Sequence, residues 1–214
     1  MDLVCNIRIA QALGHAASYR DHETGTHNIR VAYMSSIFGE ALHLSQQELQ
    51  ALMKGAFLHD IGKITIQDKI LLKNAALTDD EWTIMKTHAI LGKKFIEDLP
   101  WFEDALDVIV HHHEKFDGSG YPSALKAEEI PLNARIFAII DVFDALLSPR
   151  PYKKAFSYEK ALSILEEAKG THFDPMLLEK FIPLSAALSQ TISTNTSSEL
   201  KTKLEARRKK IFGI

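Results

Sequence analysis

The amino-acid sequence predicts an all-α protein, and three observations support this prediction. Apolar residues recur at helical spacing over most of the chain, two capping boxes precede such stretches, and strand-like alternation bounded by hairpin turns is hard to find before Phe181. The 214 residues, of which 46% are hydrophobic and 25% charged, allow one domain of about 150 to 200 residues and a tail. A core of that size needs no disulfide bond, and Cys5 is the only cysteine.

The first helices follow from capping signals and apolar stripes. One is expected around residues 26–43. The capping box of residues 45–48 opens another, whose apolar stripe ends near Gly62. Residues 78–81 form the second capping box, and the helix behind it is expected to run to about Asp98.

Further helices are expected on both sides of a fixed loop. The Gly and Pro content of residues 117–122 predicts the loop. Pro131 suits the first turn of the helix that follows, because its missing N–H would be unpaired there anyway, and Pro149 ends that helix. Three other segments with helical spacing are residues 103–115, 157–168 and 175–183.

A change of composition after Pro183 predicts three segments. Residues 1–183 form the folded domain, a Ser/Thr-rich linker follows at residues 184–198, and residues 199–214 form a basic amphipathic segment. We expect the last segment to be a solvated or docking helix, and binding to an acidic lipid surface is the alternative.

Charge and hydropathy exclude some classes of function. The net charge of -3 argues against electrostatic binding of a nucleic-acid duplex, whereas a small nucleotide is compatible with it. No uncharged apolar run approaches the about 18 to 20 residues of a membrane span, and the first ten residues lack a signal-peptide pattern. We therefore expect a cytoplasmic protein without a transmembrane segment.

Several of the ten histidines stand where the helical pattern calls for an apolar residue. His88 lies one turn after Met85 on an apolar stripe, and His112 and His113 extend the face of the two apolar residues four positions before them. A lone histidine in a core is usually structural. Several of them in one small domain, accompanied by carboxylates, indicate a metal site instead.

Two aspartates also fall in apolar surroundings. Asp60 ends an apolar helix, and Asp141 interrupts the apolar run of residues 136–143. Burying an unpaired carboxylate is costly, so each needs a cation or a full set of hydrogen-bond donors. A divalent metal is the favoured partner, and a salt bridge to a buried arginine is the alternative for Asp141. Glu23 and His27 are four residues apart and share a face if that stretch is helical.

Two motifs resemble the signature of a known family. Residues 59–63 (His-Asp-Ile-Gly-Lys) and 112–122 (His-His-Glu-Lys-Phe-Asp-Gly-Ser-Gly-Tyr-Pro) are similar to those of the HD-GYP domain, a branch of the HD phosphohydrolase superfamily. The resemblance covers residues 8–182 and implies a compact helical bundle with a metal centre in its core and the Gly-Tyr-Pro loop beside it. Residues 74–75 and Leu147 depart from the family pattern without touching a metal or phosphate position. Further matching positions follow in order at residues 24–31, 77–78, 88, 130–136, 141–145, 150–153 and 170–175.

The resemblance implies an activity and a set of ligands. The activity is that of a phosphodiesterase that opens cyclic di-GMP to linear pGpG, and that in many members continues to GMP. The implied metal ligands are Glu23, His27, His59, Asp60, His88, His112, His113 and Asp141. Their five imidazoles and three carboxylates suit iron or manganese. Two such ions about 3.5 to 4 Å apart would polarise the phosphate and generate hydroxide near neutral pH for an in-line attack that expels the 3′ oxygen.

Contacts to the substrate are implied in the same way. Asp60 would bridge the ions, and Lys63 would hold the phosphate and offset its developing charge. Arg150 and Lys153 would contact the second phosphate. A solvated lysine at position 63, and a loop that merely caps a helix, are the alternatives. The loop residues implied beside the site, where the tyrosine ring would pack against a base or ribose, are Asp117, Gly118, Gly120, Tyr121 and Pro122.

The number of ions is predicted from Glu23. Many family members carry a non-ligand residue at this position, and their sites are expected to hold two ions. A carboxylate one turn from His27 adds a hard oxygen ligand and offsets the repulsion between clustered cations. We therefore predict three ions, with Glu23 and His27 holding the third, and two ions with a solvated Glu23 as the alternative.

Three functions are weighed. The first is hydrolysis of cyclic di-GMP, and the second is hydrolysis of another cyclic dinucleotide such as 3′,3′-cyclic GMP-AMP. The third is a non-catalytic module that binds the dinucleotide or a protein partner. Every mapped ligand position is filled, which favours catalysis. A protein partner would bind through the Gly-Tyr-Pro loop or the C-terminal helix, and a homodimer is a further assembly to consider.

Overall fold

The computed structural model describes residues 3–20, 26–149 and 154–214, and these residues contain helices and no strand, as the sequence predicts. Within them, no helix is long and apolar enough to cross a membrane. The α-helices are α1 (Leu3–Arg20), α2 (His27–Ala41), α3 (Gln46–Leu58), α4 (Asp68–Leu71), α5 (Asp79–Lys86), α6 (His88–Ile96), α7 (Leu106–His111), α8 (Leu132–Leu147), α9 (Tyr158–Glu167), α10 (Pro175–Thr194) and α11 (Ser197–Phe212). Short 3-10 helices are η1 (Ile61–Thr65), η2 (Pro100–Ala105) and η3 (Ala127–Glu129).

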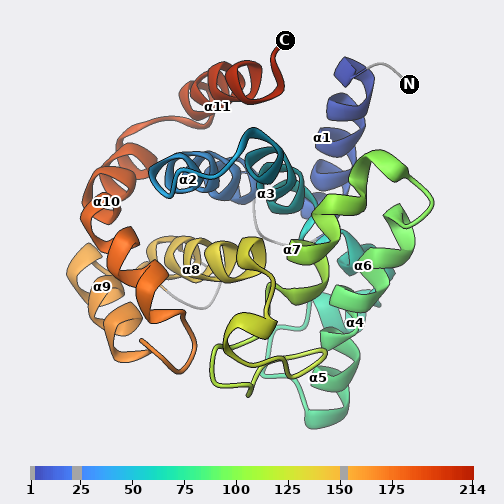
Figure 1. Ribbon diagram of the computed structural model, residues 1–214. Coiled ribbons are helices and arrows are strands. Elements are labelled where there is room, and N and C mark those ends of the chain that lie inside the picture. Colours follow the sequence, from blue (N-terminus) through green and yellow to red (C-terminus); the bar gives the residue numbers. More distant parts are fainter. Residues whose placement is uncertain (1–2, 21–25, 150–153) are drawn as a thin grey trace.

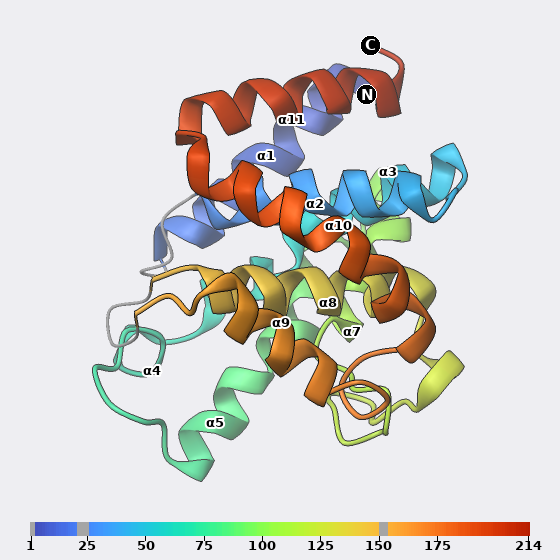
Figure 2. The ribbon, with the colours of Figure 1, turned by 90° about the vertical axis from the view of Figure 1, so that its left-hand side faces the viewer.

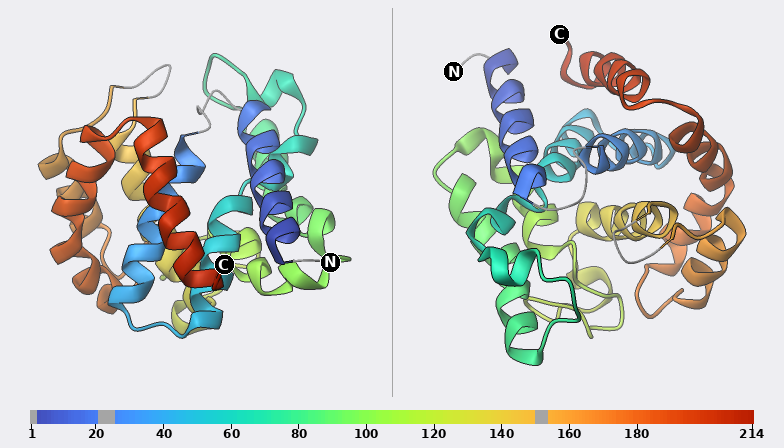
Figure 3. Two further views of the ribbon diagram at one scale, coloured as in Figure 1. Left: turned by 90° about the horizontal axis from the view of Figure 1, so that it is seen from above. Right: turned by 180° about the vertical axis from the view of Figure 1, so that it is seen from behind.

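The centre of the molecule is formed by α2, α3 and α8, and α7 packs against both α3 and α8 (Figure 1). Helices α9 and α10 lie on one side of this centre and α4 to α6 on the other, as Figures 2 and 3 show from further directions. Helix α8 is apolar around most of its circumference, so it lies in the interior. It thereby carries Asp141 and Asp144 into the core.

Both predicted capping boxes are confirmed. Ser45 and Thr78 each accept a hydrogen bond from the backbone N–H three residues later, and the glutamates there accept one from the capping residue. Helix α3 ends at Leu58, earlier than expected, and the chain turns into η1. Gly62 lets η1 pack directly on α6, because a Cβ atom at this position would lie 1.9 Å from the carbonyl oxygen of His88.

The single helix expected to run to about Asp98 is instead two helices, α5 and α6, that meet at Thr87. The Thr87 N–H donates to the carbonyl of Ile84, three residues back, and its hydroxyl bonds to the same oxygen. The His88 ring donates to the carbonyl of Met85. These bonds tighten the turn and end α5, a detail that apolar spacing does not encode. The helix expected at residues 103–115 is likewise divided, into η2 and α7.

The linker predicted at residues 184–198 is helical in the structure as far as Thr194. Helix α10 continues through Pro183, and Asn195 and Thr196 alone separate it from α11. Because Leu188 packs into the core, tertiary contacts outweigh the weak helix propensity of the Ser/Thr-rich sequence. Helix α11 packs on α2 and α3, where Arg207 pairs with Glu40 at 2.7 Å. The basic segment is therefore a docked helix.

Candidate metal centre

His59 and Asp60 lie at the junction of α3 and η1, where the backbone leaves the first helix. The His59 side chain is 1% exposed, and its Nδ1 atom donates to the carbonyl of Ala56 at 3.0 Å. This bond fixes the ring, so that the unprotonated Nε2 atom points away from the backbone.

A first group of ligands contains His27, His59 and Asp60. The Nε2 atoms of His27 and His59 are 3.4 Å apart, and His59 Nε2 lies 3.1 Å from Asp60 Oδ2. Asp141 joins this group from α8, since its Oδ1 atom is 3.4 Å from His27 Nε2. The residues come from α2, from the junction of α3 and η1, and from α8.

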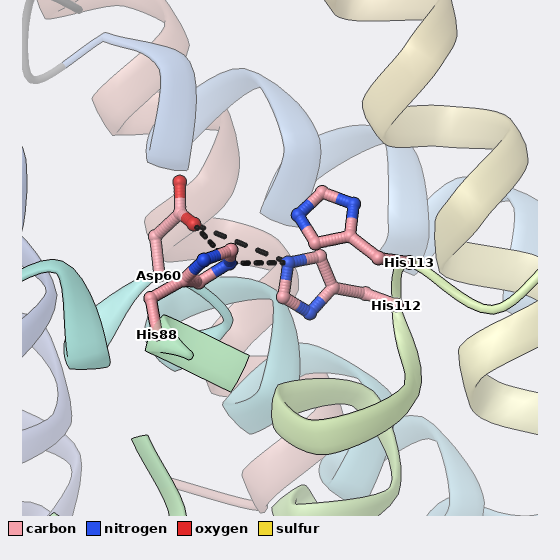
Figure 4. Close-up of side chains that lie close together, drawn as sticks. All are labelled: Asp60, His88, His112 and His113. Carbon is pink, nitrogen blue, oxygen red and sulfur yellow. Dashed lines mark hydrogen bonds and ion pairs between the residues drawn. The ribbon is translucent and has the colours of Figure 1, made fainter. Parts of the chain in front are cut away.

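A second group contains Asp60, His88, His112 and His113, whose ligand atoms all lie within 4.8 Å of one another (Figure 4). The Nε2 atoms of His88 and His112 are 3.4 Å apart, and Asp60 Oδ1 is 3.4 Å from His88 Nε2. His88 begins α6, and His112 and His113 directly follow α7. Asp60 is the member that the two groups share.

Hydrogen bonds fix which nitrogen of each buried ring carries the proton. His88 Nδ1 donates to Met85, and His112 Nδ1 donates to Val108, both at backbone carbonyls that can only accept. His27 Nδ1 donates to the Asp144 carboxylate at 2.8 Å. The Nε2 atoms of all four rings therefore present lone pairs, and they face each other in pairs 3.4 Å apart. Facing lone pairs repel, so this arrangement fits cations bound between them.

Burial favours the neutral rings that metal binding needs. It lowers the pKa of His112 and His113 well below the usual range, and it also lowers that of His88. Burial opposes ionisation of Asp60, but the nearby ammonium group of Lys63 outweighs it and holds the pKa of this carboxyl well below its ordinary value. Lys63 Nζ lies 2.8 Å from Asp60 Oδ2. The centre thus offers neutral imidazoles around an ionised carboxylate.

Asp144, to which the sequence pattern assigns no role, supports the first group from the side away from the candidate ligand atoms. It is fully buried, and Arg30 binds it with two parallel hydrogen bonds, Nε to Oδ1 at 2.6 Å and Nη2 to Oδ2 at 2.8 Å. Burial opposes its ionisation, yet bonds from Arg30 and His27 lower its pKa to about 2. The sequence signal that could have identified Asp144 is its position in an apolar helix, three residues after Asp141. A salt bridge to a buried arginine was the alternative expected for Asp141, and in the structure Asp144 forms such a bridge with the largely buried Arg30.

Glu114 is a second residue without an assigned role, and it holds the loop beside the centre. Its carboxylate accepts hydrogen bonds from the backbone N–H groups of Ser123 at 2.7 Å and Leu125 at 3.2 Å. Gly120 passes so close that a Cβ atom would lie 2.3 Å from the nitrogen of Lys115. The Tyr121 ring packs on the His113 ring with centroids 4.7 Å apart. The loop therefore lies against the second group of ligands.

The other predicted loop residues belong to the same turn. Gly118 has a φ of 85°, a value that favours glycine. Asp117 is exposed, and its carboxylate accepts the backbone N–H of Ser119 at 2.8 Å. Pro122 follows Tyr121 in the turn. Their contact with a substrate stays a prediction.

Three predicted site residues, Glu23, Arg150 and Lys153, lie outside the described residues. The third ion and the contacts to the second phosphate therefore stay predictions. Elemental analysis tests the former: about three ions per chain, falling to about two in Glu23→Gln, is the expected result. None of His43, His111 and His172 belongs to either ligand group found among the described residues.

Comparison with known proteins identifies similar sequences and folds. The sequence profile of the HD domain matches residues 11–177. The chain is 41% identical over 187 residues to a probable cyclic di-GMP phosphodiesterase of Vibrio cholerae, covering 80% of this chain and 42% of that protein. It is 37% identical over 185 residues to a 3′3′-cGAMP-specific phosphodiesterase of the same organism, covering 82% of this chain and 35% of that protein. The chain thus spans less than half the length of these relatives.

A solved structure shares the fold. The crystal structure of a cyclic GMP-AMP-specific phosphodiesterase from V. cholerae superposes with a TM-score of 0.66 at 20% identity, over 95% of this chain and 58% of the other. At this identity the likeness concerns the fold alone.

Proposed function

The chain belongs to the HD domain family, and from this premise we propose that it is a metal-dependent phosphodiesterase that hydrolyses cyclic di-GMP to pGpG. The observation that carries the proposal is the paired Nε2 atoms of four histidines, arranged around the shared carboxylate of Asp60. Similarity to cyclic di-GMP phosphodiesterases over most of the chain supports the choice of substrate.

The residues have distinct roles in this proposal. His27, His59, Asp60 and Asp141 would hold one cation, and Asp60 with His88, His112 and His113 would hold another. Bound divalent cations polarise a phosphate and lower the pKa of water, and the mixed nitrogen and oxygen donors suit iron or manganese. Lys63, whose Nζ atom is 2.8 Å from Asp60, lies where a positive charge would offset the charge that develops on the phosphate.

The test uses protein loaded anaerobically with manganese or iron and incubated with cyclic di-GMP. Chromatography should show pGpG, and its further decay would show whether GMP follows. Replacing His59 and Asp60 together with alanine should abolish turnover while circular dichroism stays helical. Near-wild-type turnover in this double variant, at equal metal content, would show that the site is wrongly assigned. Tight binding of cyclic di-GMP without any hydrolysis would favour the non-catalytic module.

A second candidate is hydrolysis of 3′,3′-cyclic GMP-AMP, and one observation favours it. The 3′3′-cGAMP-specific phosphodiesterase is 37% identical to the chain, against 41% for the probable cyclic di-GMP phosphodiesterase. Running the same assay with both dinucleotides at equal concentration decides between them. A higher kcat/KM for the mixed dinucleotide would replace the first candidate.

A further inference from the structure

Lys86 lies between two aromatic rings at the edge of the metal centre. Its Nζ atom is 5.9 Å from the centre of the Trp82 ring and 5.6 Å from that of Tyr121, both within the range of a cation–π contact. Trp82 and Lys86 are one turn apart on α5, and Tyr121 comes from the loop that Glu114 holds. Figures 1 and 3 show α5 beside this loop. We call Trp82, Lys86 and Tyr121 the aromatic ledge.

Lys86 has no anionic partner among the described residues, in contrast to three other buried or partly buried lysines. Lys54, Lys63 and Lys73 each pair with a carboxylate at 2.8 Å or less. Across the described parts of the chain, the Lys86 ammonium group has no carboxylate within ion-pair distance and no hydrogen bond. A half-buried ammonium group therefore keeps its hydrogen-bond donors free for a ligand.

The aromatic ledge continues directly from the ligands of the second group. The Tyr121 ring packs on His113, and Lys86 precedes the ligand His88 by two residues. Trp82 is 45% exposed, so one large aromatic surface beside the site remains open to solvent. A nucleotide whose phosphate lies at the metal centre has its base one ribose away, and the contact of Tyr121 with His113 places the ledge directly beside that centre.

We propose that the aromatic ledge binds a purine base of the substrate and that Lys86 selects guanine over adenine. This inference rests on the proposed function for the placement of the phosphate. The base stacks on the exposed ring of Trp82, and the ammonium group donates to its Hoogsteen edge. Guanine presents two acceptors there, O6 and N7, whereas adenine presents N7 beside the N6 amino donor. An ammonium group, which can only donate, therefore binds guanine better.

Binding of GMP and AMP tests the proposal without requiring hydrolysis. The two mononucleotides carry the same phosphate, so a difference between their affinities reports the base alone. Metal-loaded protein is titrated with each, and tryptophan fluorescence is recorded. Wild type should bind GMP about tenfold more tightly than AMP. Lys86→Met should weaken GMP about tenfold and change AMP by less than about twofold, and Lys94→Met, an exposed lysine on α6, is the matched control.

Variants of the two tryptophans distinguish base stacking on the aromatic ledge from a general effect on nucleotide binding. Trp82→Leu should remove the fluorescence change and weaken both nucleotides, because stacking does not depend on the base. Trp101→Phe should retain the change, since Trp101 packs against Phe212 of α11. Equal weakening of GMP and AMP in Lys86→Met would assign Lys86 to the phosphate and overturn the proposal. Unchanged affinity for both nucleotides would overturn it as well.

The outcome is distinguishable from failure of the proposed function. Hydrolysis of bis(p-nitrophenyl) phosphate, a phosphodiester without a base, is measured beside that of cyclic di-GMP. Loss of the GMP preference in Lys86→Met supports the ledge, whether or not the wild type hydrolyses cyclic di-GMP. Failure of the wild type to hydrolyse cyclic di-GMP would refute only the proposed function. If wild type does hydrolyse cyclic di-GMP and Lys86→Met keeps the preference for GMP, the ledge is refuted and the function stands.

Discussion

Asp60 offers one carboxylate oxygen to each group of ligands. Oδ2 lies 3.1 Å from His59 Nε2, and Oδ1 lies 3.4 Å from His88 Nε2. Every other ligand among the described residues belongs to a single group. Removing a histidine should therefore weaken one site, whereas removing the Asp60 charge should weaken both.

Asp60→Asn should weaken both groups, so that bound metal falls from about three ions per chain to at most one. The amide keeps one oxygen ligand but loses the negative charge and the second oxygen. Elemental analysis after reconstitution with manganese provides the measurement. Asp80→Asn removes an exposed carboxylate of α5 with the same change in net charge, and it should leave the metal content as in wild type. Two tightly bound ions in Asp60→Asn would contradict a shared role.

Asp144 links the core to the metal centre, because it binds Arg30 and His27 together. Asp144→Asn removes the buried negative charge that Arg30 binds with two hydrogen bonds, and we expect the free energy of unfolding to fall by about 3 kcal/mol. Urea denaturation of the metal-free protein measures this loss. A double variant, Arg30→Met with Asp144→Leu, removes both charges of this pair and should lose less than the sum of its two single variants. Wild-type stability of Asp144→Asn would show that the pair contributes little.

At the level of the helices, α11 stabilises the fold without supplying a metal ligand. Leu200, Leu204 and Ile211 are buried against the core. This stripe is therefore not available to an acidic lipid surface while the helix is docked. Two of its basic residues, Arg207 and Lys210, serve the docking, because both pair with Glu40 of α2.

Leu204→Ala should lower the free energy of unfolding by about 3 kcal/mol, because it leaves a cavity between α11 and the helices beneath it. The bound metal and the turnover at saturating substrate should stay as in wild type. Denaturation followed by circular dichroism gives the stability, and Lys201→Ala, at an exposed position of the same helix, is the control. A loss below about 0.5 kcal/mol would mean that α11 is not docked in solution.

Sequence reasoning succeeded for elements whose signal is local. The capping boxes at Ser45 and Thr78 depend on residues three positions apart, and both form as predicted. It failed at a helix break that apolar spacing does not encode, and at a segment whose structure tertiary contacts decide. The break at Thr87 depends on side-chain bonds to the preceding turn, and the helical stretch after Pro183 depends on burial of Leu188.

In the metal centre, too, the sequence pattern predicts some residues, whereas the role of others depends on tertiary contacts. Apolar periodicity identified His88 and Asp60 as residues that need a partner in the core, and the structure brings them within 3.4 Å. The pattern cannot say which of two acids in α8 joins the ligands, because Asp141 and Asp144 stand in equally apolar surroundings. Only the position of Arg30 on α2 decides that Asp144 supports His27 from behind.

Across the whole molecule, the ligands tie together elements distant in sequence. They come from α2, from the junction of α3 and η1, from α6, from the end of α7 and from α8. Unfolding separates these elements and so destroys both groups. Metal that binds the folded chain and not the unfolded one must therefore raise stability, by about 2.7 kcal/mol per site when its free concentration is a hundred times the dissociation constant.

Loading with manganese should thus raise the melting temperature by about 5 to 10 °C for each site filled under that condition, given the usual scaling for a chain of this size. Differential scanning calorimetry of apo and reconstituted protein measures the shift, and a chelator should reverse it. His113→Ala, which removes a ligand of the second group alone, should keep about half of the shift. Asp60→Asn should keep almost none, because it weakens both groups at once. An equal shift in wild type and Asp60→Asn would mean that the stabilising metal binds elsewhere on the protein.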